Sequence, residues 1–254
     1  MRTANQALDA YMQKLLISVL LLLSLSVLGQ EPTSVKVEAL PSSETASIAS
    51  VRTELEAMLE TDQSHRQEVI ELEKKHGRNS TEVTEAWSKQ NAIDAQNIRR
   101  LEEIVAKHGW PGSTQFGQKA AGASFLILQH SDLSYQKKYL PLAREAAAKG
   151  EMRTSNLALL EDRVHLREGQ KQIYGSQVTR NSADEWEPLP LDDEEKVDAR
   201  RASVGLGPIS EYLQGFASRS GGRVNPKWTK KEGPNKAPDS TPTPVTSPAA
   251  PEPR

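Results

Sequence analysis

His130 and Asp132 are the residues of this chain whose types and spacing best suit acid–base chemistry. His130 ends a strongly apolar segment, and Asp132 follows two residues later, where its carboxylate can fold back towards the imidazole. A histidine oriented by an aspartate is the basic unit of a general base. In the structural alternative, His130 satisfies the last carbonyls of its helix and Asp132 caps the next one. For this pair alone, the structural interpretation is favoured.

Arg163 is the second unusual placement, because leucines lie one turn back and one turn on along its helix. A guanidinium cannot lose its charge, so an unpaired one inside the protein would be very costly. We therefore expect Arg163 to contact a carboxylate, with Asp62 and Asp132 as the leading candidates, unless carbonyls or an anionic ligand take that place. Asp162 has apolar neighbours too. An ion-pair network between helices and a ligand pocket both account for these placements.

The histidines and carboxylates of this chain do not have the spacing of a recognised metal-binding motif. Glu161 and His165 lie one turn apart on the polar side of their helix, and with His130 and Asp132 they could surround an ion. No His-Glu-x-x-His or comparable spacing exists, so neither a metal nor a cofactor is predicted. The chain also lacks a glycine-rich phosphate loop, a Gly-x-Ser-x-Gly elbow and any cysteine. Most familiar catalytic classes are therefore unsupported.

The elements that must position these residues are mostly helices. Apolar residues recur at helical steps over 51–76 and again over 82–108, with a capping signal at Asn79-Ser-Thr between them. Two long helices joined by a short loop predict a helical hairpin with coiled-coil character. Further helices are expected at 118–130, 135–149 (interrupted near Pro141), 156–168, 192–204 and 208–217, with a strand at 172–178 and a return arm at 186–190. We predict a mainly α fold, in which the N-terminal helical hairpin packs with a helical bundle and a short β-hairpin.

Residues 1–29 have the order of a secretory signal peptide. Arg2 and Lys14 precede an apolar run of about fourteen residues, and Gly29 follows it. A membrane span needs roughly twenty apolar residues, so an uncleaved anchor is the weaker alternative. We expect an exported protein, periplasmic or extracellular, with no membrane span after cleavage. Because the chain has no cysteine, this export would not bring disulfides with it.

Composition divides the rest of the chain into three segments. Residues 30–47 are rich in Ser, Thr, Pro and Glu and predict a flexible spacer, while 48–220 predict a single mostly helical domain. Residues 221–254 predict a disordered Pro-rich tail, whose removal after Ser220 should leave the melting temperature unchanged. The net charge of −2 gives no electrostatic argument for binding nucleic acid.

Several polar motifs between residues 55 and 213 resemble those of an uncharacterised bacterial family. In this chain they read Asp62-Gln63-Ser-His-Arg66, Asn97-Ile-Arg-Arg100-Leu101, Gly109-Trp110-Pro111, Gln129-His130-Ser131-Asp132, Leu160-Glu-Asp162-Arg163, Tyr174-Gly175-Ser176-Gln177 and Arg200-Arg201 ahead of Gly205-Leu206-Gly207. Each motif alone is weak, but their joint spacing is specific. The family has no established activity to transfer. The resemblance implies that the polar motifs belong to one domain and could share one pocket.

These observations define one candidate site and three functions. His130 and Asp132 are the candidates for catalysis. The candidate ligand-binding residues are Asp62, Arg66, Trp110, Gln136, Asp162, Arg163, Gln172, Tyr174, Gln177 and Arg200. A domain that binds a small polar or peptidic ligand ranks first. The alternatives are a hydrolase-like enzyme, with His130 as general base and water as the attacking group, and a purely structural or protein-interaction module.

Overall fold

A computed structural model describes residues 42–229 of this chain, and the expected signal peptide lies outside the described residues. The described part is mainly α with one small sheet, which confirms the predicted fold class. The helices are α2 (Ser42–His76), α3 (Thr81–His108), α4 (Ser113–His130), α5 (Leu133–Ala148), α6 (Thr154–Arg167), η3 (Glu194–Lys196), α7 (Val197–Ser203), α8 (Ile209–Ser220) and η4 (Pro226–Trp228). The strands are β1 (Val178–Arg180), β2 (Glu185–Pro188) and β3 (Arg223–Val224).

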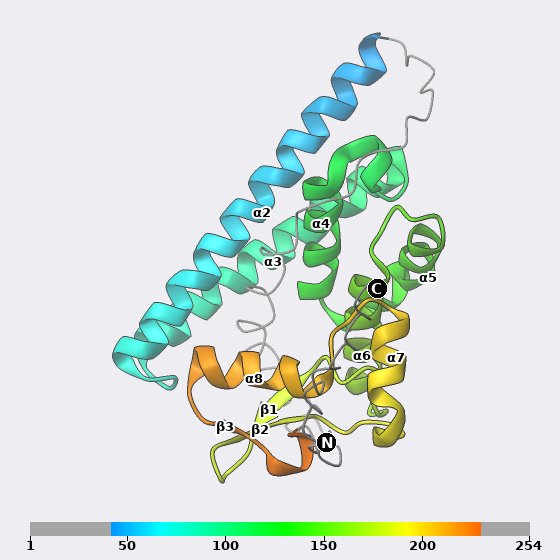
Figure 1. The fold of residues 1–254 in the computed structure, drawn as a ribbon. Coiled ribbons are helices and arrows are strands. Elements are labelled where there is room, and N and C mark those ends of the chain that lie inside the picture. The colour runs from blue at the N-terminus through cyan, green and yellow to red at the C-terminus, as the bar shows by residue number, and fades with distance from the viewer. Residues whose placement is uncertain (1–41, 230–254) are drawn as a thin grey trace, which may run out of the picture.

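Helices α2 and α3 form the predicted hairpin and run side by side along one edge of the molecule (Figure 1). Gly77 ends α2 with a φ of 83°, a conformation that glycine adopts without steric cost. Ser80 is the N-cap of α3, and its side chain accepts a hydrogen bond from the Val83 amide at 3.3 Å. The expected cap is therefore present. It fixes the turn, and the turn sets how the two helices lie against each other.

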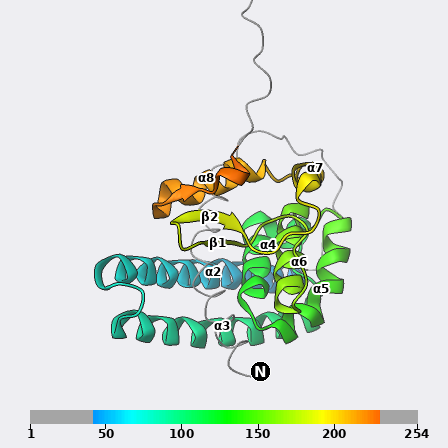
Figure 2. The same cartoon turned by 90° about the horizontal axis from the view of Figure 1, so that it is seen from below.

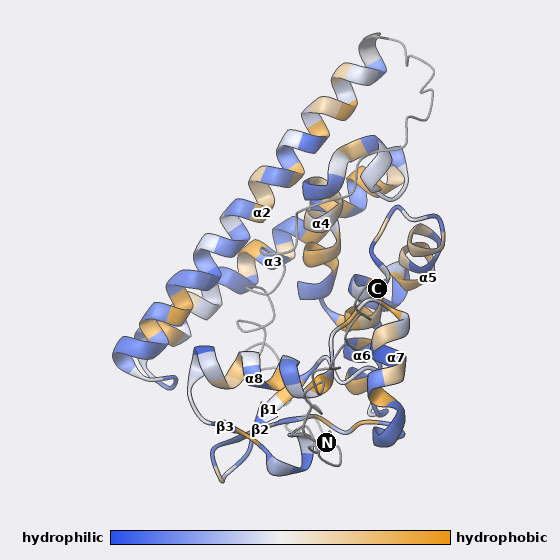
Figure 3. Ribbon diagram, in the orientation of Figure 1, coloured by the Kyte–Doolittle hydropathy of each residue, from blue (hydrophilic) through white to orange (hydrophobic). Residues whose placement is uncertain are grey.

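Helix α4 is the centre of the bundle. It packs on α2, α3, α5 and α6, and its second half is apolar on nearly every side (Figure 3). Phe116, Ala120, Phe125 and Leu128 are fully buried along it. A helix that is apolar all round must be surrounded by other elements, as the sequence indicated. Its last residue, His130, therefore lies in the interior and not at the surface.

Helices α5 and α6 pack against each other beside α4. The fourth expected helix is present as α5, but the interruption expected near Pro141 is absent, since the helix runs through this residue to Ala148. Proline removes one backbone donor and leaves the remaining hydrogen bonds of a helix possible on either side. None of the helices within 42–229 combines the length with the apolar character that a membrane crossing requires.

The sheet lies between α8 and the helical bundle (Figure 2). Strand β2 pairs antiparallel with β1 and parallel with β3. The strand expected at 172–178 is wrong for most of its length, because β1 begins only at Val178 and the residues before it form a loop with a single bridge, Gln172 to Leu191. Two boundaries also differ. Helix α2 begins inside the segment expected to be a spacer, and β3 and η4 extend the folded part beyond residue 220.

Candidate functional site

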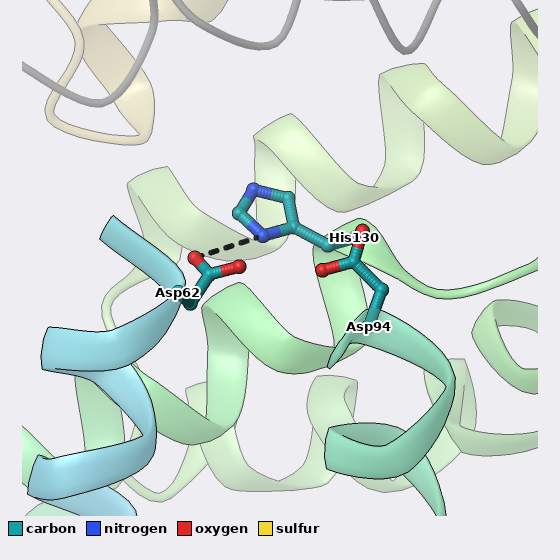
Figure 4. A group of neighbouring side chains, drawn as sticks. All are labelled: Asp62, Asp94 and His130. Carbon is teal, nitrogen blue, oxygen red and sulfur yellow. Dashed lines mark ion pairs between the residues drawn. The ribbon is translucent and has the colours of Figure 1, made fainter. Parts of the chain in front are cut away.

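Three helices bring a set of polar side chains together inside the protein. Asp62 and Arg66 lie one turn apart on α2, and Gln90 and Asp94 lie one turn apart on α3. Residues four apart share one face of a helix, so each pair points towards the other helix. His130 completes the group from the end of α4. Figure 4 shows its imidazole beside the carboxylates of Asp62 and Asp94.

Within this cluster, Arg66 and Gln90 hold both carboxylates. Arg66 donates from Nε to Asp62 Oδ1 at 3.0 Å and from Nη2 to the two oxygens of Asp94 at 2.7 and 2.9 Å. The Nε2 group of Gln90, fully buried, donates to Asp62 Oδ1 and to Asp94 Oδ1, each at 2.9 Å. The bonds from Arg66 to Asp94 and from Gln90 to Asp62 cross between α2 and α3. The bonds from Arg66 to Asp62 and from Gln90 to Asp94 stay within one helix. The cluster therefore ties α2 to α3 through charge-assisted hydrogen bonds.

His130 lies beside Asp62. Its Nδ1 atom is 3.4 Å from Asp62 Oδ2, and its side chain is only 1% exposed. Neither Nδ1 nor Nε2 makes a hydrogen bond among residues 42–229. Burial lowers the pKa of His130, and the charge of Arg66 lowers it further, against the opposing effect of Asp62. Burial alone would raise the pKa of Asp62, but His130 and Arg66 together bring it below its usual range. Burial therefore favours the neutral imidazole, while the charged groups around Asp62 favour its ionised carboxylate.

The expected pairing of His130 with Asp132 is therefore not the one the structure has. Asp132 is exposed and occupies the N-cap position of α5, although its side chain makes no capping hydrogen bond. The carboxylate beside His130 comes instead from Asp62 on α2.

Arg163 is buried, with 1% of its surface exposed, and it has no carboxylate partner among residues 42–229. Its Nε and Nη1 atoms make no hydrogen bond in that range. The prediction that Arg163 pairs with Asp62 or Asp132 is wrong. Burial lowers the pKa of Arg163, and the charges of Arg167 and Arg66 lower it further. Asp62 is unavailable because Arg66 already occupies it.

The neighbours of Arg163 on α6 show what it faces. One turn earlier, the carbonyl of Leu159 accepts a hydrogen bond from Gln129 Nε2 at 3.5 Å. One turn later, Arg167 donates from Nη1 to the carbonyl of Ser131 at 2.7 Å. Residues four apart line one face of a helix, so Arg163 lies between these contacts and faces the last turn of α4. That turn carries His130, so the unpaired guanidinium and the imidazole belong to one region.

Gln129 and Gln136 add hydrogen-bond acceptors to this region. Gln136 donates from Nε2 to the carbonyls of Leu128 and Gln129, at 3.4 and 2.9 Å, and so satisfies the end of α4. The Oε1 atoms of Gln129 and Gln136 are buried and have no donor among residues 42–229. Unsatisfied donors and acceptors therefore meet around the end of α4.

Asp162 has a different role from that of the cluster around His130. It is fully buried and accepts hydrogen bonds from the backbone amides of Ile173, Tyr174 and Ser176, at 2.7, 2.9 and 2.9 Å. A carboxylate with three amide donors has little capacity left for a ligand. The structure thus uses Asp162 to hold the loop that was expected to be a strand.

Other candidates hold the same loop. Arg200 donates from Nε to the Ile173 carbonyl at 2.8 Å, and Arg201 donates from Nη1 to the Tyr174 carbonyl at 2.8 Å. Gln172 donates from Nε2 to the Gln177 carbonyl at 2.8 Å and accepts from the Gln177 amide at 2.9 Å. The side chain of Tyr174 is half-buried beside them. These residues form a hydrogen-bonded frame around the loop.

Trp110 stands apart from both groups. It packs against the apolar core just before α4 begins, whereas His130 is at the opposite end of that helix. The helix also bends between these two ends, at Gly117, where φ is 82° and ψ is 161°. The sequence-based candidates therefore fall into three places: the cluster around His130, the frame of the loop, and the start of α4.

Sequence analysis assigned no role to Asp94 and Gln90, although they belong to the cluster. Both lie on the face of α3 whose buried apolar residues run at helical steps from Trp87 to Ile98 and Leu101. Polar residues that interrupt such an apolar face were the available signal.

Asp62, Asp94 and His130 each offer one ligand atom, and these atoms lie within 4.8 Å of one another. Carboxylate oxygens and an imidazole nitrogen suit zinc and related ions. Arg66, however, already bonds both carboxylates, so a cation would have to displace a guanidinium from its two partners. The expectation of no bound metal stays a prediction.

A cavity of about 440 Å³ lies elsewhere, between α4 and the segment that joins α5 to α6. Its lining includes Ser113, Lys119, Phe125, Glu151 and Arg153. None of the candidate residues from the sequence lines it, so this cavity and the cluster around His130 are separate features.

Comparison with known proteins gives a family and no function. A family model described as a family of unknown function (DUF6624) matches residues 49–225. No curated protein and no solved structure matches the chain.

Proposed function

The chain belongs to this family of unknown function, and from the site itself we propose that its domain binds a small polar ligand beside His130. The supporting observation is a group of buried polar atoms that lack hydrogen-bond partners within 42–229. They are Arg66 Nη1, Gln90 Oε1, Gln129 Oε1, His130 Nδ1 and Nε2, Gln136 Oε1, and Arg163 Nε and Nη1. Buried polar groups are nearly always paired, and each one left unpaired costs about 1–3 kcal/mol.

Several such atoms in one region favour a bound polar molecule over a purely structural network. A structural network gains its stability from being complete, and a half-satisfied one is worse than an apolar core. Both donors and acceptors are free here, so a ligand with both would satisfy the site. The ligand must be small, because the atoms that would bind it are buried.

The test is a thermal-shift screen of small polar compounds on the full chain. A specific ligand at a hundred times its dissociation constant adds about 2.7 kcal/mol to the free energy of unfolding. We expect His130→Gln to abolish the shift. His65→Gln is the matched control, since His65 lies on α2 three residues from Asp62 and its side chain is partly exposed, at 38%. Shifts that persist unchanged in His130→Gln would place the ligand elsewhere and contradict the proposal.

A hydrolase is the second candidate, because the imidazole of His130 lies beside the carboxylate of Asp62, the two groups of a general-base pair. Burial favours the neutral imidazole, Nδ1 is 3.4 Å from Asp62 Oδ2, and Nε2 is the nitrogen that would take a proton from water. The hydroxyl of Ser131 donates to the Leu128 carbonyl at 2.8 Å, so it does not serve as nucleophile in this arrangement.

Turnover of chromogenic ester, amide and phosphoester substrates would test this candidate. We expect any hydrolysis to be lost in His130→Gln, to fall in Asp62→Asn and to remain in His65→Gln. Activity that survives in His130→Gln would exclude the histidine as the base.

We also propose that the protein is exported, on the strength of the signal-like order of residues 1–29. N-terminal sequencing of the mature protein should place the cleavage near Gly29. An intact N-terminus on the protein recovered from its host would contradict export by this route.

A further inference from the structure

We propose that the ligand of this site carries an anionic group, a carboxylate or a phosphate, and that Arg163 binds it. The inference rests on the proposed function and names the chemical class of its ligand. It follows from how differently the buried arginines of this protein are satisfied.

Arg66 and Arg201 show what a structurally satisfied arginine is like in this fold. Arg66 bonds two carboxylates, as described above. Arg201, 1% exposed, donates to the carbonyls of Gly207 and Tyr174 at 2.6 and 2.8 Å, and its guanidinium lies over the Tyr212 ring, 4.7 Å from the centroid. Each of these charges is compensated by neighbouring groups, so neither needs a ligand.

Arg163 is buried to the same degree and has no such compensation. Two of its three guanidinium nitrogens make no hydrogen bond within 42–229. The charged groups that act on it most are the cations Arg66 and Arg167, and the remaining neighbour with an effect is the hydroxyl of Tyr212. Since a guanidinium stays protonated in proteins, Arg163 carries a buried positive charge that no carboxylate among residues 42–229 pairs with.

An anion removes this imbalance, and a neutral ligand does not. Arginine is the residue best suited to carboxylates and phosphates, because it offers several N–H donors in one plane. Arg66 supports the same interpretation, since its Nη1 atom is buried and unpaired while its other nitrogens hold Asp62 and Asp94.

The first experiment compares the stability of two variants of the full chain without added anion. Arg163→Met removes a charge that has no partner, so we expect a melting temperature equal to that of the wild type or higher. Arg201→Met is the matched control, with the same change at an equally buried arginine, and we expect its melting temperature to fall by several degrees because it loses two carbonyl partners. If Arg163→Met loses as much as Arg201→Met, Arg163 is structural and the inference is wrong.

The second experiment titrates sodium phosphate or sodium acetate against sodium chloride at constant ionic strength, with melting temperature as the readout. We expect a saturable rise in the wild type with phosphate, which indicates a phosphate group, or with acetate, which indicates a carboxylate. The rise should vanish in Arg163→Met and weaken in Arg163→Lys, which keeps the charge but loses the planar group of donors. No saturable rise in the wild type, or the same rise in Arg163→Met, would overturn the inference.

The two proposals fail in distinguishable ways. A neutral polar compound whose shift is lost in His130→Gln but kept in Arg163→Met would support a ligand site beside His130 and refute an anionic ligand. A compound whose shift is kept in both variants would refute the site itself.

Discussion

Replacing Asp162 by asparagine tests whether this aspartate holds the loop at 172–177 or binds a ligand. Oδ1 of Asp162 accepts from the amides of Ile173 and Tyr174, and Oδ2 accepts from the amide of Ser176. Asparagine has nearly the same shape, but one of its two terminal atoms is an NH2 group. Whichever way the amide is turned, a donor then faces at least one backbone N–H donor.

The expected destabilisation follows from these three hydrogen bonds. At least one buried N–H loses its partner, which costs about 1–3 kcal/mol. The bonds that remain are no longer made to a charged acceptor, and this change weakens each by about 1 kcal/mol. We therefore expect Asp162→Asn to lower the free energy of unfolding by about 3–5 kcal/mol.

Urea denaturation followed by circular dichroism measures this quantity, with the midpoint and slope fitted separately. Asp132→Asn is the control, since the same chemical change at an exposed side chain without hydrogen bonds should stay within about 0.5 kcal/mol. A loss below about 1 kcal/mol for Asp162→Asn would refute the argument, because the three amides would then be satisfied without the carboxylate.

The remaining predictions concern pH, metal and the C-terminal tail. The pKa of His130 is lowered on folding, so the unfolded chain takes up its proton first and stability should fall below about pH 6.5, by up to about 1.4 kcal/mol per pH unit. In His130→Gln, the melting temperature should depend less on pH between pH 7 and 5. Asp94, whose pKa is raised by burial, acts in the opposite direction. An unchanged slope of melting temperature against pH would show that the imidazole is not responsible. Elemental analysis should find no stoichiometric zinc in the purified chain, whereas about one zinc per chain, lost in His130→Ala, would show that the cation displaces the arginine. Truncation after Ser220 should lower the melting temperature, contrary to the expectation from composition, because it removes β3 and also Trp228, which packs on the core. Truncation after Thr229 is the control that retains both. Equal melting temperatures of the two truncated chains would contradict this prediction.

The features that sequence could predict are those that repeat locally. The helical hairpin follows from apolar periodicity, from Gly77 and from the cap at Ser80, all of which act within a few residues. The burial of His130 follows from the apolar character of α4 on every side. Each of these inferences needs only one segment of chain, and the structure agrees with it.

The features that sequence missed depend on distant segments. The partner of His130 is Asp62, which lies on another helix, and no short window relates the two. The loop at 172–177 has the composition of a strand, but its amides bond to the carboxylate of Asp162 on α6 instead of to a neighbouring strand. In each case the contact depends on how two elements distant in the chain are aligned along each other. The spacing of apolar residues within one element does not determine that alignment.

The polar cluster between α2 and α3 also determines how far one helix can slide along the other. The hairpin has few buried apolar residues near its turn, chiefly Val69, Val83 and Trp87, and apolar packing alone tolerates a shift by one helical turn. Such a shift moves one helix by about 5.4 Å and would separate Arg66 from Asp94 and leave both charges buried without partners. A buried polar contact of this kind selects one alignment from several that would be nearly equal in energy, as polar residues do in coiled coils. The hairpin can therefore vary its outer surface freely while the alignment that presents Asp62 to His130 stays fixed.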